Sequence, residues 1–306
     1  MIPVKKLNTY SITAFDPINN QLGVAVQSHW FAVGALCPWI EPGVGVIATQ
    51  SLVEVSYGPK GMDLLRKGRS AQDALNILLQ ADKNPAVRQV AIVDAAGRTA
   101  VHTGEKCIAH AGHIARGSFS VQANMMLKDT VWGAMAEAFE RSSGLLSERL
   151  FAALCAAQKE GGDIRGMQSA SMKVVENIND QSPWTHLQTD IRVDDHPDPI
   201  TELRRLLDLE KAYNFMNEGD DLMSRNHPQA AREKYAHAAR LAPDVNEVPF
   251  WQAVTTAESG HIDEAVPIFK KVFDIDENWR ELVRRLPACG LLNIDESDLD
   301  RILNIE

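Results

Sequence analysis

The sequence has few cysteines, few aromatic residues and no excess of positive charge. Its four cysteines form no C-x-x-C pair and no dense framework of the kind that small secreted domains need; they are Cys37, Cys107, Cys155 and Cys289. Reduced thiols and a cytoplasmic location are therefore expected. Lys and Arg number 31 against 41 Asp and Glu, which gives a formal net charge of −10. Because no basic run offsets this balance, neither nucleic acid nor an anionic membrane is expected as the main partner.

Long hydrophobic runs are also lacking. The most apolar stretch, residues 31–40, is short and contains Pro38, whereas a membrane-spanning helix needs about 20 apolar residues. The first residues lead directly into an alternating segment, without the apolar stretch and small-residue cleavage site of a signal peptide. We therefore expect neither a membrane span nor an export signal.

The composition that remains is that of an ordinary globular protein. Hydrophobic residues make up 45% and charged residues 24% of the chain, which fits neither disordered, collagenous nor coiled-coil classes. At about 100–200 residues per domain, 306 residues favour two domains.

Blocks of strands and paired helices alternate over the first two thirds of the chain. Apolar alternation and turn residues predict strands in residues 9–28, 44–51, 88–104, 107–126, 169–175 and 189–193. Helical periodicity predicts amphipathic helices over 57–67, 71–81, 128–141 and 146–159. This order suits two sheets packed between helical layers better than a strict strand-helix alternation. We therefore predict an α+β fold, a four-layer αββα sandwich over residues 1–197.

The remaining residues, 198–306, are predicted to form a small all-α domain. Asp198 is a plausible N-cap with Pro199 at the first helical position. Small and large apolar residues recur 34 positions apart, which is the tetratricopeptide period; the pairs are Ala231 and Ala265, Tyr235 and Phe269, and Leu241 and Ile275. Two copies are fewer than the three that such repeats need to stand alone, so this tail is expected to lean on the first domain or on a partner.

Common chemical motifs are missing. The sequence has no H-E-x-x-H, no phosphate-binding G-x-x-x-x-G-K-[ST], no dinucleotide G-x-G-x-x-G on a strand and no G-x-S-x-G elbow. His110 and His113 would point to opposite faces if their segment is a strand. The cluster Asp194, Asp195 and His196 is interpreted as a capping linker because it is rich in Pro. No metal and no organic cofactor are therefore expected.

A polar set on strand ends is what remains for chemistry. It consists of Thr9, Ser11, Ser28, Thr49, Gln50, Gln122, Asn124, Asp163, Arg165, Gln168 and Ser169. Each of these taken singly is more often a capping or edge residue than a catalyst. Together they occur in segments that resemble a known family.

The chain resembles a bacterial family of unknown function, of the DUF1028 type, that is placed in the amino-terminal-nucleophile (Ntn) hydrolase superfamily. The resemblance covers residues 9 to about 207 and rests on eight stretches in order: T-Y-S-I-T-A-F-D-P, L-G-V-A-V-Q-S, A-V-G-A-L-C-P, G-V-G-V-I-A-T-Q-S, Y-G-P-K-G-M-D-L-L, V-Q-A-N-M-M, G-G-D-I-R-G-M-Q-S-A and I-R-V-D-D-H-P-D-P-I-T-E-L-R-R-L-L. It implies the αββα fold and, by analogy at the level of the fold, hydrolysis of an amide bond.

The resemblance implies Thr9 as the nucleophile, because family members commonly begin Met-Thr-[Phe/Tyr]-Ser. A free α-amine, with a pKa of about 7.7–8.0, accepts the proton of the adjacent hydroxyl. Asn124 or Gln50 would stabilise the oxyanion, and Asp163 with Arg165 would orient the amine. Eight residues precede Thr9, so its nitrogen is an amide unless the Asn8–Thr9 bond is cut. In an uncut chain, Ser11 or Ser28 would be an internal hydroxyl; Gln50, Gln122, Gln168 and Ser169 are expected to contact the substrate.

Two functions thus stay open at the level of sequence. The first is an Ntn-type hydrolase of a small amide or peptide, and the second is a binding or scaffold protein without catalysis that keeps the same pocket. The segment W-R-E-L-V-R-R-L-P-A-C-G-L-L resembles the C-terminal extension of longer family members, which has been suggested to bind peptidoglycan. The tail is therefore expected to hold a protein or glycan partner, unless it is simply a packing helix. A homo-oligomer, most simply a dimer, is expected for either function.

Overall fold

The computed structural model of the chain describes residues 6, 7, 9–225 and 227–305. Contacts between Cα atoms divide it into two compact units, residues 1–204 and 205–306. The first unit contains both sheets, and the second is helical. The described part of the chain is thus a mixed α/β protein with two antiparallel sheets and a helical C-terminal region. None of its helices is both long and apolar enough to span a bilayer.

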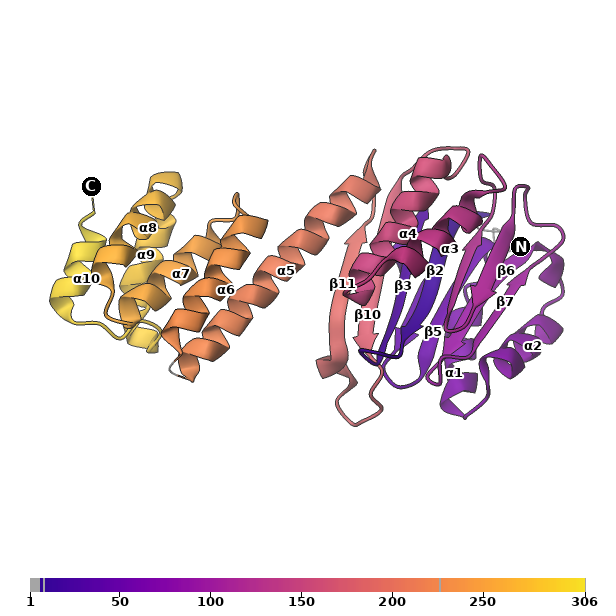
Figure 1. Cartoon of the computed structure of the whole chain (residues 1–306), viewed down its shortest axis with the longest axis horizontal. Coiled ribbons are helices and arrows are strands. Elements are labelled where there is room, and N and C mark those ends of the chain that lie inside the picture. Colours follow the sequence, from indigo (N-terminus) through magenta and orange to yellow (C-terminus); the bar gives the residue numbers. More distant parts are fainter. Residues whose placement is uncertain (1–5, 8, 226, 306) are drawn as a thin grey trace. The chain divides into compact units, whose positions relative to one another are not determined.

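Two antiparallel sheets form the first unit (Figure 1). One has the order β1-β5-β6-β7, with β4 also beside β5; its strands are β1 (Lys6–Leu7), β4 (Pro38–Glu41), β5 (Gly45–Leu52), β6 (Arg88–Asp94) and β7 (Thr99–Thr103). The other has the order β11-β10-β3-β2-β9-β8; its strands are β2 (Thr9–Asp16), β3 (Gln21–Ser28), β8 (Gly112–Arg116), β9 (Phe119–Ala123), β10 (Ser169–Glu176) and β11 (Leu187–Val193). The chain passes from the first sheet to the second between Leu7 and Thr9.

Two helices cover the outer face of each sheet. The helices α1 (Tyr57–Arg66) and α2 (Ala71–Ala81) bury Met62, Leu75 and Leu78 against Ile47 of the first sheet. The helices α3 (Val131–Arg141) and α4 (Leu146–Glu160) pack on β2, β3 and β9 of the second. A third apolar cluster, which includes Val24, Val26, Val46 and Ala48, joins the two sheets face to face.

Side chains along β2 alternate between these layers, as strand geometry requires. Tyr10 points to α4, where its hydroxyl donates to Oε1 of Gln158 at 3.1 Å. Ser11 points to the first sheet and reaches Gln50 of β5. The inner face of β2 therefore carries hydroxyls into the space between the sheets.

Most predicted helices and strands of this unit agree closely with the structure. Helix α2 has the predicted bounds, and the Ser70 hydroxyl caps it by accepting from the amide of Asp73 at 3.1 Å. Helix α3 begins at Val131 rather than at Lys128, because the Lys128 and Thr130 side chains bind Glu160 instead.

Helix α5 (Pro199–Ser224) begins where the sequence placed it, with Asp198 accepting from the amide of Thr201 at 3.1 Å. The contact division nevertheless falls after residue 204 rather than after 197. The first turn of α5 belongs to the first unit, because Leu203 is buried and Arg204 forms an ion pair with Glu148 of α4 at 2.8 Å.

One pair of helices in the helical unit recurs at the predicted spacing. Helices α6 (Pro228–Leu241) and α8 (Ile262–Ile275) begin and end 34 residues apart; the others are α7 (Glu247–Glu258), α9 (Asn278–Arg285) and α10 (Glu296–Leu303). Ala231, Tyr235, Ala265 and Phe269 are fully buried, so two of the sequence pairs occupy equivalent core positions. The third pair differs, because Leu241 packs on a core whereas Ile275 is 69% exposed.

Candidate functional site

Buried polar side chains gather between the sheets at one end of the first unit. At this end Thr9 begins β2, Ser28 ends β3, Gln50 lies near the end of β5, Gln89 near the start of β6, and Asn124 just follows β9. All five residues are fully buried. Polar groups in an interior are tolerated where they satisfy one another, so we define these residues with Ser11, Ser120 and Gln122 as the inter-sheet network.

The Gln50 amide is the centre of the inter-sheet network. Its Oε1 accepts from the Ser11 hydroxyl at 2.6 Å, and its Nε2 donates to Oε1 of Gln89 at 2.7 Å and to the carbonyl of Thr9 at 3.2 Å. Ser11 in turn accepts from Nε2 of Gln122 at 2.6 Å. Burial raises the pKa of the Cys37 thiol, which stays neutral and makes a weak 3.8 Å contact with Gln50.

Thr9 occupies the edge of this network. Its hydroxyl donates to the Ser28 hydroxyl at 3.1 Å, and its carbonyl accepts from the backbone amide of Asn124 at 3.1 Å. The Asn124 side chain donates to Gln89 at 2.8 Å, while its Oδ1 has no hydrogen-bond partner in the described part of the chain. The bond that precedes Thr9 belongs to Asn8, which lies outside the described residues.

The backbone beside the network is held in a costly conformation. Of the four non-glycine residues with positive φ in the described ranges, Ser51 (71°) follows Gln50 and Met125 (59°) follows Asn124. A third, Ala32 (52°), lies in the loop after Ser28. Such conformations cost about 1–3 kcal/mol each and concentrate at functional sites. Gln50 and Asn124, two of the amides of the network, are therefore each followed by a residue in a strained backbone conformation.

Asp163 and Arg165 are paired with each other at the same end of the second sheet. The Asp163 side chain is fully buried, and the guanidinium binds it through Nε at 3.0 Å and Nη2 at 2.7 Å. The backbone of His29, which follows Ser28, also reaches Asp163 at 3.5 Å. Asp163 thus anchors the loop that continues from the Thr9–Ser28 pair.

Gln168 and Ser169 do not join the inter-sheet network. The Ser169 hydroxyl donates to the carbonyl of Trp30 and accepts from the amide of Val33, so it fixes the loop after β3. Gln168 donates to Asp195 at 3.0 Å near the surface. These contacts hold the adjoining loops. Ser169 is paired with Ser28, and Ser28 with Thr9, so the three side chains lie on the same face of the second sheet.

The linker cluster has the capping role that its Pro-rich setting predicts. Asp194 pairs with Arg192 at 2.8 Å, and the ring of His196 accepts from the amide of Asp198 at 3.0 Å. No group of three or more His, Cys, Asp or Glu that could hold a metal ion occurs among the described residues.

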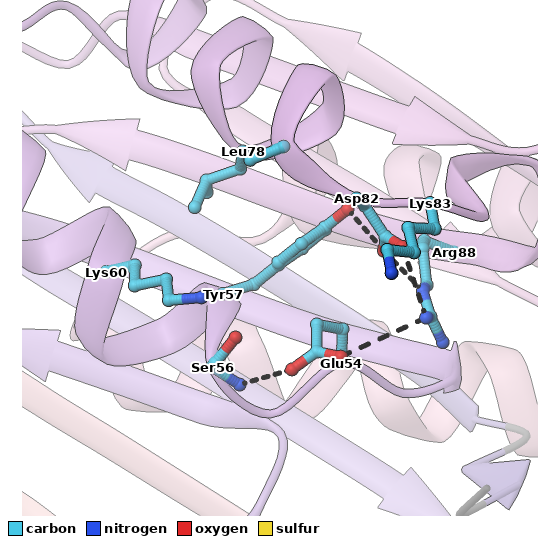
Figure 2. Close-up of a pocket in the computed structure, with 9 residues that line it drawn as sticks. Glu54, Ser56, Tyr57, Lys60, Leu78, Asp82, Lys83 and Arg88 are labelled. Carbon is cyan, nitrogen blue, oxygen red and sulfur yellow. Dashed lines mark hydrogen bonds and ion pairs between the residues drawn. The ribbon is translucent and has the colours of Figure 1, made fainter.

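A small polar pocket opens on the α1–α2 side (Figure 2). Tyr57 points across it and donates to Asp82 at 2.9 Å, and Arg88 binds the same carboxylate at 2.7 Å. Burial, reinforced by the bond to Asp82, raises the pKa of Tyr57. Burial would also raise the pKa of Asp82, but its bonds to Arg88 and to the Asn84 amide lower it overall. The pocket has a volume of about 360 Å³, and the Asp82–Arg88 ion pair forms part of its wall.

A larger cavity of about 650 Å³ lies between the β7–β8 loop and the start of α3. His110 lies in the loop and His113 in β8, and both line this cavity. The His113 ring contacts the Thr103 hydroxyl at 2.8 Å, and that hydroxyl accepts from Gln89 at 2.9 Å. The larger cavity therefore adjoins the inter-sheet network directly.

Sequence reasoning missed Gln89 and Ser120. Gln89 links Gln50, Asn124 and Thr103, and Ser120 donates to Gln122 at 2.8 Å. The available signal was the register of β5 and β6, since Gln50 and Gln89 are directly paired. A single Gln in an apolar strand does not show which residue lies opposite it in the neighbouring strand. It also does not show that the second sheet supplies further hydrogen-bond partners.

Comparison with known proteins identifies the family. Residues 9–203 match the model of a family of unknown function, DUF1028. A crystal structure of protein SPO2555 from Silicibacter pomeroyi, described with the same family model, is 31% identical with a TM-score of 0.59; the match covers 65% of this chain and 84% of that one. No curated protein matches the chain. The chain belongs to the DUF1028 family.

Proposed function

We propose that the protein is an Ntn-type hydrolase of a small amide or peptide bond, with Thr9 as the nucleophile. One observation carries the proposal. Thr9 is the first residue of the central strand β2, and its hydroxyl donates to the Ser28 hydroxyl beside the buried side-chain amides of Gln50 and Asn124. Two face-to-face antiparallel sheets with helices outside are consistent with an Ntn-type αββα sandwich. Because a fold hosts many functions, the site rather than the fold supports the chemistry.

The reaction requires a free Thr9 amine, so the Asn8–Thr9 bond must first be cut. In the mature chain the amine takes the proton of the Thr9 hydroxyl, and Oγ1 attacks the substrate carbonyl carbon. The carbon–nitrogen bond then breaks as the amine returns the proton to the leaving nitrogen, and water hydrolyses the resulting ester. Thr9 is thus regenerated without a metal or an organic cofactor.

This chemistry needs donors for the oxyanion and groups that position the amine and the nucleophile, and the surrounding side chains are of these types. The side-chain amides of Asn124 and Gln50 are held beside Thr9, because each donates both to the Thr9 carbonyl and to Gln89; an oxyanion formed at Thr9 would take one of these N–H groups from its present acceptor. The unpaired Oδ1 of Asn124 is an acceptor available for an N–H of the amine or of the substrate. The Asp163–Arg165 pair fixes the His29 loop and thereby the position of Ser28.

The activities of the wild-type chain and of three variants test the proposal. Each is produced behind a removable leader so that residue 9 is the first residue, and is assayed on a panel of amino-acyl p-nitroanilides. The wild-type and Thr9→Ser chains are expected to release p-nitroaniline, while Thr9→Ala loses about 10³-fold or more of the rate. Thr13→Val, which changes a buried hydroxyl on the same strand, is the matched control and should stay active. Equal rates for Thr9→Ala and wild type would overturn the proposal.

The second candidate is a binding protein that keeps an uncut amino-terminal segment. It is favoured by β1, where Lys6 and Leu7 pair with Leu52 and Ser51 of β5 in the intact chain. In this case the helical unit, whose α6 and α8 repeat at the tetratricopeptide spacing, would hold a protein or glycan partner. A pull-down with peptidoglycan fragments, using the uncut chain, tests this function. Homo-oligomer formation stays a prediction under either function.

A further inference from the structure

The hydrogen bonds around Gln89 fix which way the neighbouring side-chain amides face. The Gln89 side-chain nitrogen lies 2.9 Å from the carbonyl of Ala123 and 3.2 Å from the carbonyl of Gly112. Because a carbonyl oxygen only accepts, the end of Gln89 that faces these two groups must be its NH2 end. Its Oε1 end then faces Gln50 and Asn124, so both of these amides turn an NH2 group toward Gln89, at 2.7 and 2.8 Å.

This orientation leaves Asn124 with an unfilled acceptor. Its Nδ2 donates to Gln89 and to the Thr9 carbonyl at 3.4 Å, whereas its Oδ1 has no hydrogen-bond partner among the described residues. Within the inter-sheet network, whose residues the structure describes in full, no other buried side-chain atom lacks a partner. Asn124 is fully buried, and a buried acceptor without a donor is unfavourable. The site is therefore short of one N–H or O–H group.

The unfilled acceptor belongs to the residue that adjoins Thr9. Asn124 binds the Thr9 carbonyl through its backbone amide at 3.1 Å as well as through its side chain. In the uncut chain, β1 pairs with the end of β5 directly after Gln50. The proposed cleavage before Thr9 removes β1 from this end of the network. A substrate held at Thr9 thus lies next to Asn124.

We infer that Asn124 Oδ1 accepts a hydrogen bond from an N–H of the substrate, and that Gln89 is the positioning residue that keeps this end of the amide free. The substrate is then an amide with an N–H next to its scissile carbonyl. Two groups of a peptide supply such an N–H: the scissile amide itself and the α-nitrogen on the acyl side. The role of this contact in hydrolysis rests on the proposed function, whereas binding of an N–H donor does not.

Binding of three small peptides to a Thr9→Ala chain that begins at residue 9 tests the contact without hydrolysis. The probes are N-acetyl-alanine methylamide, which has both N–H groups, its analogue methylated at the alanine nitrogen, and N-acetyl-alanine dimethylamide. In NMR titrations, the first probe is expected to bind saturably and to shift the side-chain resonances of Asn124. At least one methylated probe should bind about tenfold more weakly, and the one that does so identifies the N–H that Asn124 accepts.

The ratio of these affinities distinguishes a positioning role from a purely structural one. Asn124→Leu removes the acceptor, and Gln89→Met removes the groups that orient it, so in either background the ratio should fall below about twofold. Thr13→Val, which removes another buried hydroxyl of β2, is the matched control and should keep the tenfold ratio. Melting temperatures establish that each variant is folded; if Asn124→Leu is not, Gln89→Met and the ratio in the parent chain still decide.

Three outcomes would overturn the inference: no saturable binding, equal affinities for all three probes, or a tenfold ratio that Asn124→Leu and Gln89→Met both retain. Equal affinities would mean that solvent, and not a substrate N–H, fills Oδ1. Failure of the hydrolase proposal is a separate result, because it appears as equal p-nitroanilide hydrolysis by wild type and Thr9→Ala and involves no measurement of these affinities.

Discussion

Replacing the central amide of the inter-sheet network tests whether that network is as well satisfied as its distances indicate. Gln50→Leu keeps the volume of the side chain and removes both of its polar ends. The Ser11 hydroxyl then loses the acceptor at 2.6 Å, and Gln89 loses a donor at 2.7 Å. Because both groups are fully buried, water does not replace either bond.

The cost can be worked from these contacts. An orphaned buried hydroxyl costs about 1–3 kcal/mol, and the bond to Gln89 adds about 1 kcal/mol, since Gln89 keeps its partner Asn124. The sum is about 2–4 kcal/mol. For a unit of this size each kcal/mol lowers the melting temperature by about 2–4 °C, so the expected loss is about 4–16 °C.

Thermal unfolding followed by circular dichroism measures this loss, with the sheet-containing unit read in the β-sensitive signal. Gln72→Leu is the matched control, because Gln72 is exposed on α2 and donates to Asn76 on the same helix, and its effect should stay within about 0.5 kcal/mol. Ser11→Ala combined with Gln50→Leu should cost less than the sum of the single changes, since the two side chains share a bond.

A small effect would refute the reasoning. If Gln50→Leu lowers the melting temperature no more than Gln72→Leu does, the amide does not satisfy buried partners and the network does not position Thr9.

Three further outcomes follow from named contacts. Asp163→Asn should lower the free energy of unfolding of the first unit by about 2–4 kcal/mol in urea, because a fully buried carboxylate loses its charge opposite Arg165. Asp190→Asn should lower it by less than about 1 kcal/mol, because Asp190 and its partner Lys173 are partly exposed to solvent. The bonds of His186 to Asp180 and then to Glu176 raise the pKa of His186, so the stability from this group is complete below its ordinary value of 6.5 and is lost as pH rises through the raised pKa. Amide exchange in residues 177–187, corrected for its intrinsic pH dependence, should therefore show more opening at pH 8 than at pH 6, and His186→Gln should abolish this difference. Ala265 is fully buried in the helical unit, so Ala265→Leu should overpack this core and lower the free energy of unfolding by about 1–3 kcal/mol. Ile275→Ala, at an exposed position, should change the free energy of unfolding by less than about 0.5 kcal/mol. Equal effects of the two variants would contradict the assignment of Ala265 to the core.

Local patterns predicted most of the fold because the elements have clear periodicity and caps. Ser70 and Asp198 cap their helices as expected, and the apolar strand that became β5 is buried on both faces. The start of α3 was placed three residues early, because the sequence does not show that Lys128 and Thr130 bind Glu160, which lies 30 residues or more away. Long-range contacts of this kind decide element ends.

The candidate site was predictable only in part, for the same reason. Thr9, Ser11, Gln50, Gln122 and Asn124 lie on inward-facing or terminal strand positions, and the structure brings them together. Gln89 was missed because its role arises from the pairing of β5 with β6 and from the second sheet above it. Gln168 and Ser169 are polar residues at a strand end like the others, yet their side chains hold loops. Polarity at a strand end does not distinguish a residue that fixes a loop from one that belongs to a functional site.

Intact-mass spectrometry of the protein purified from its native host tests the central claim most directly, with a Thr9→Ala variant prepared in the same way. The account predicts a wild-type chain that lacks residues 1–8 and begins at Thr9, and a variant that keeps them. A wild-type chain of full length would contradict the account, because an amide nitrogen at Thr9 is not a base and Thr9 would then not act as an amine-assisted nucleophile.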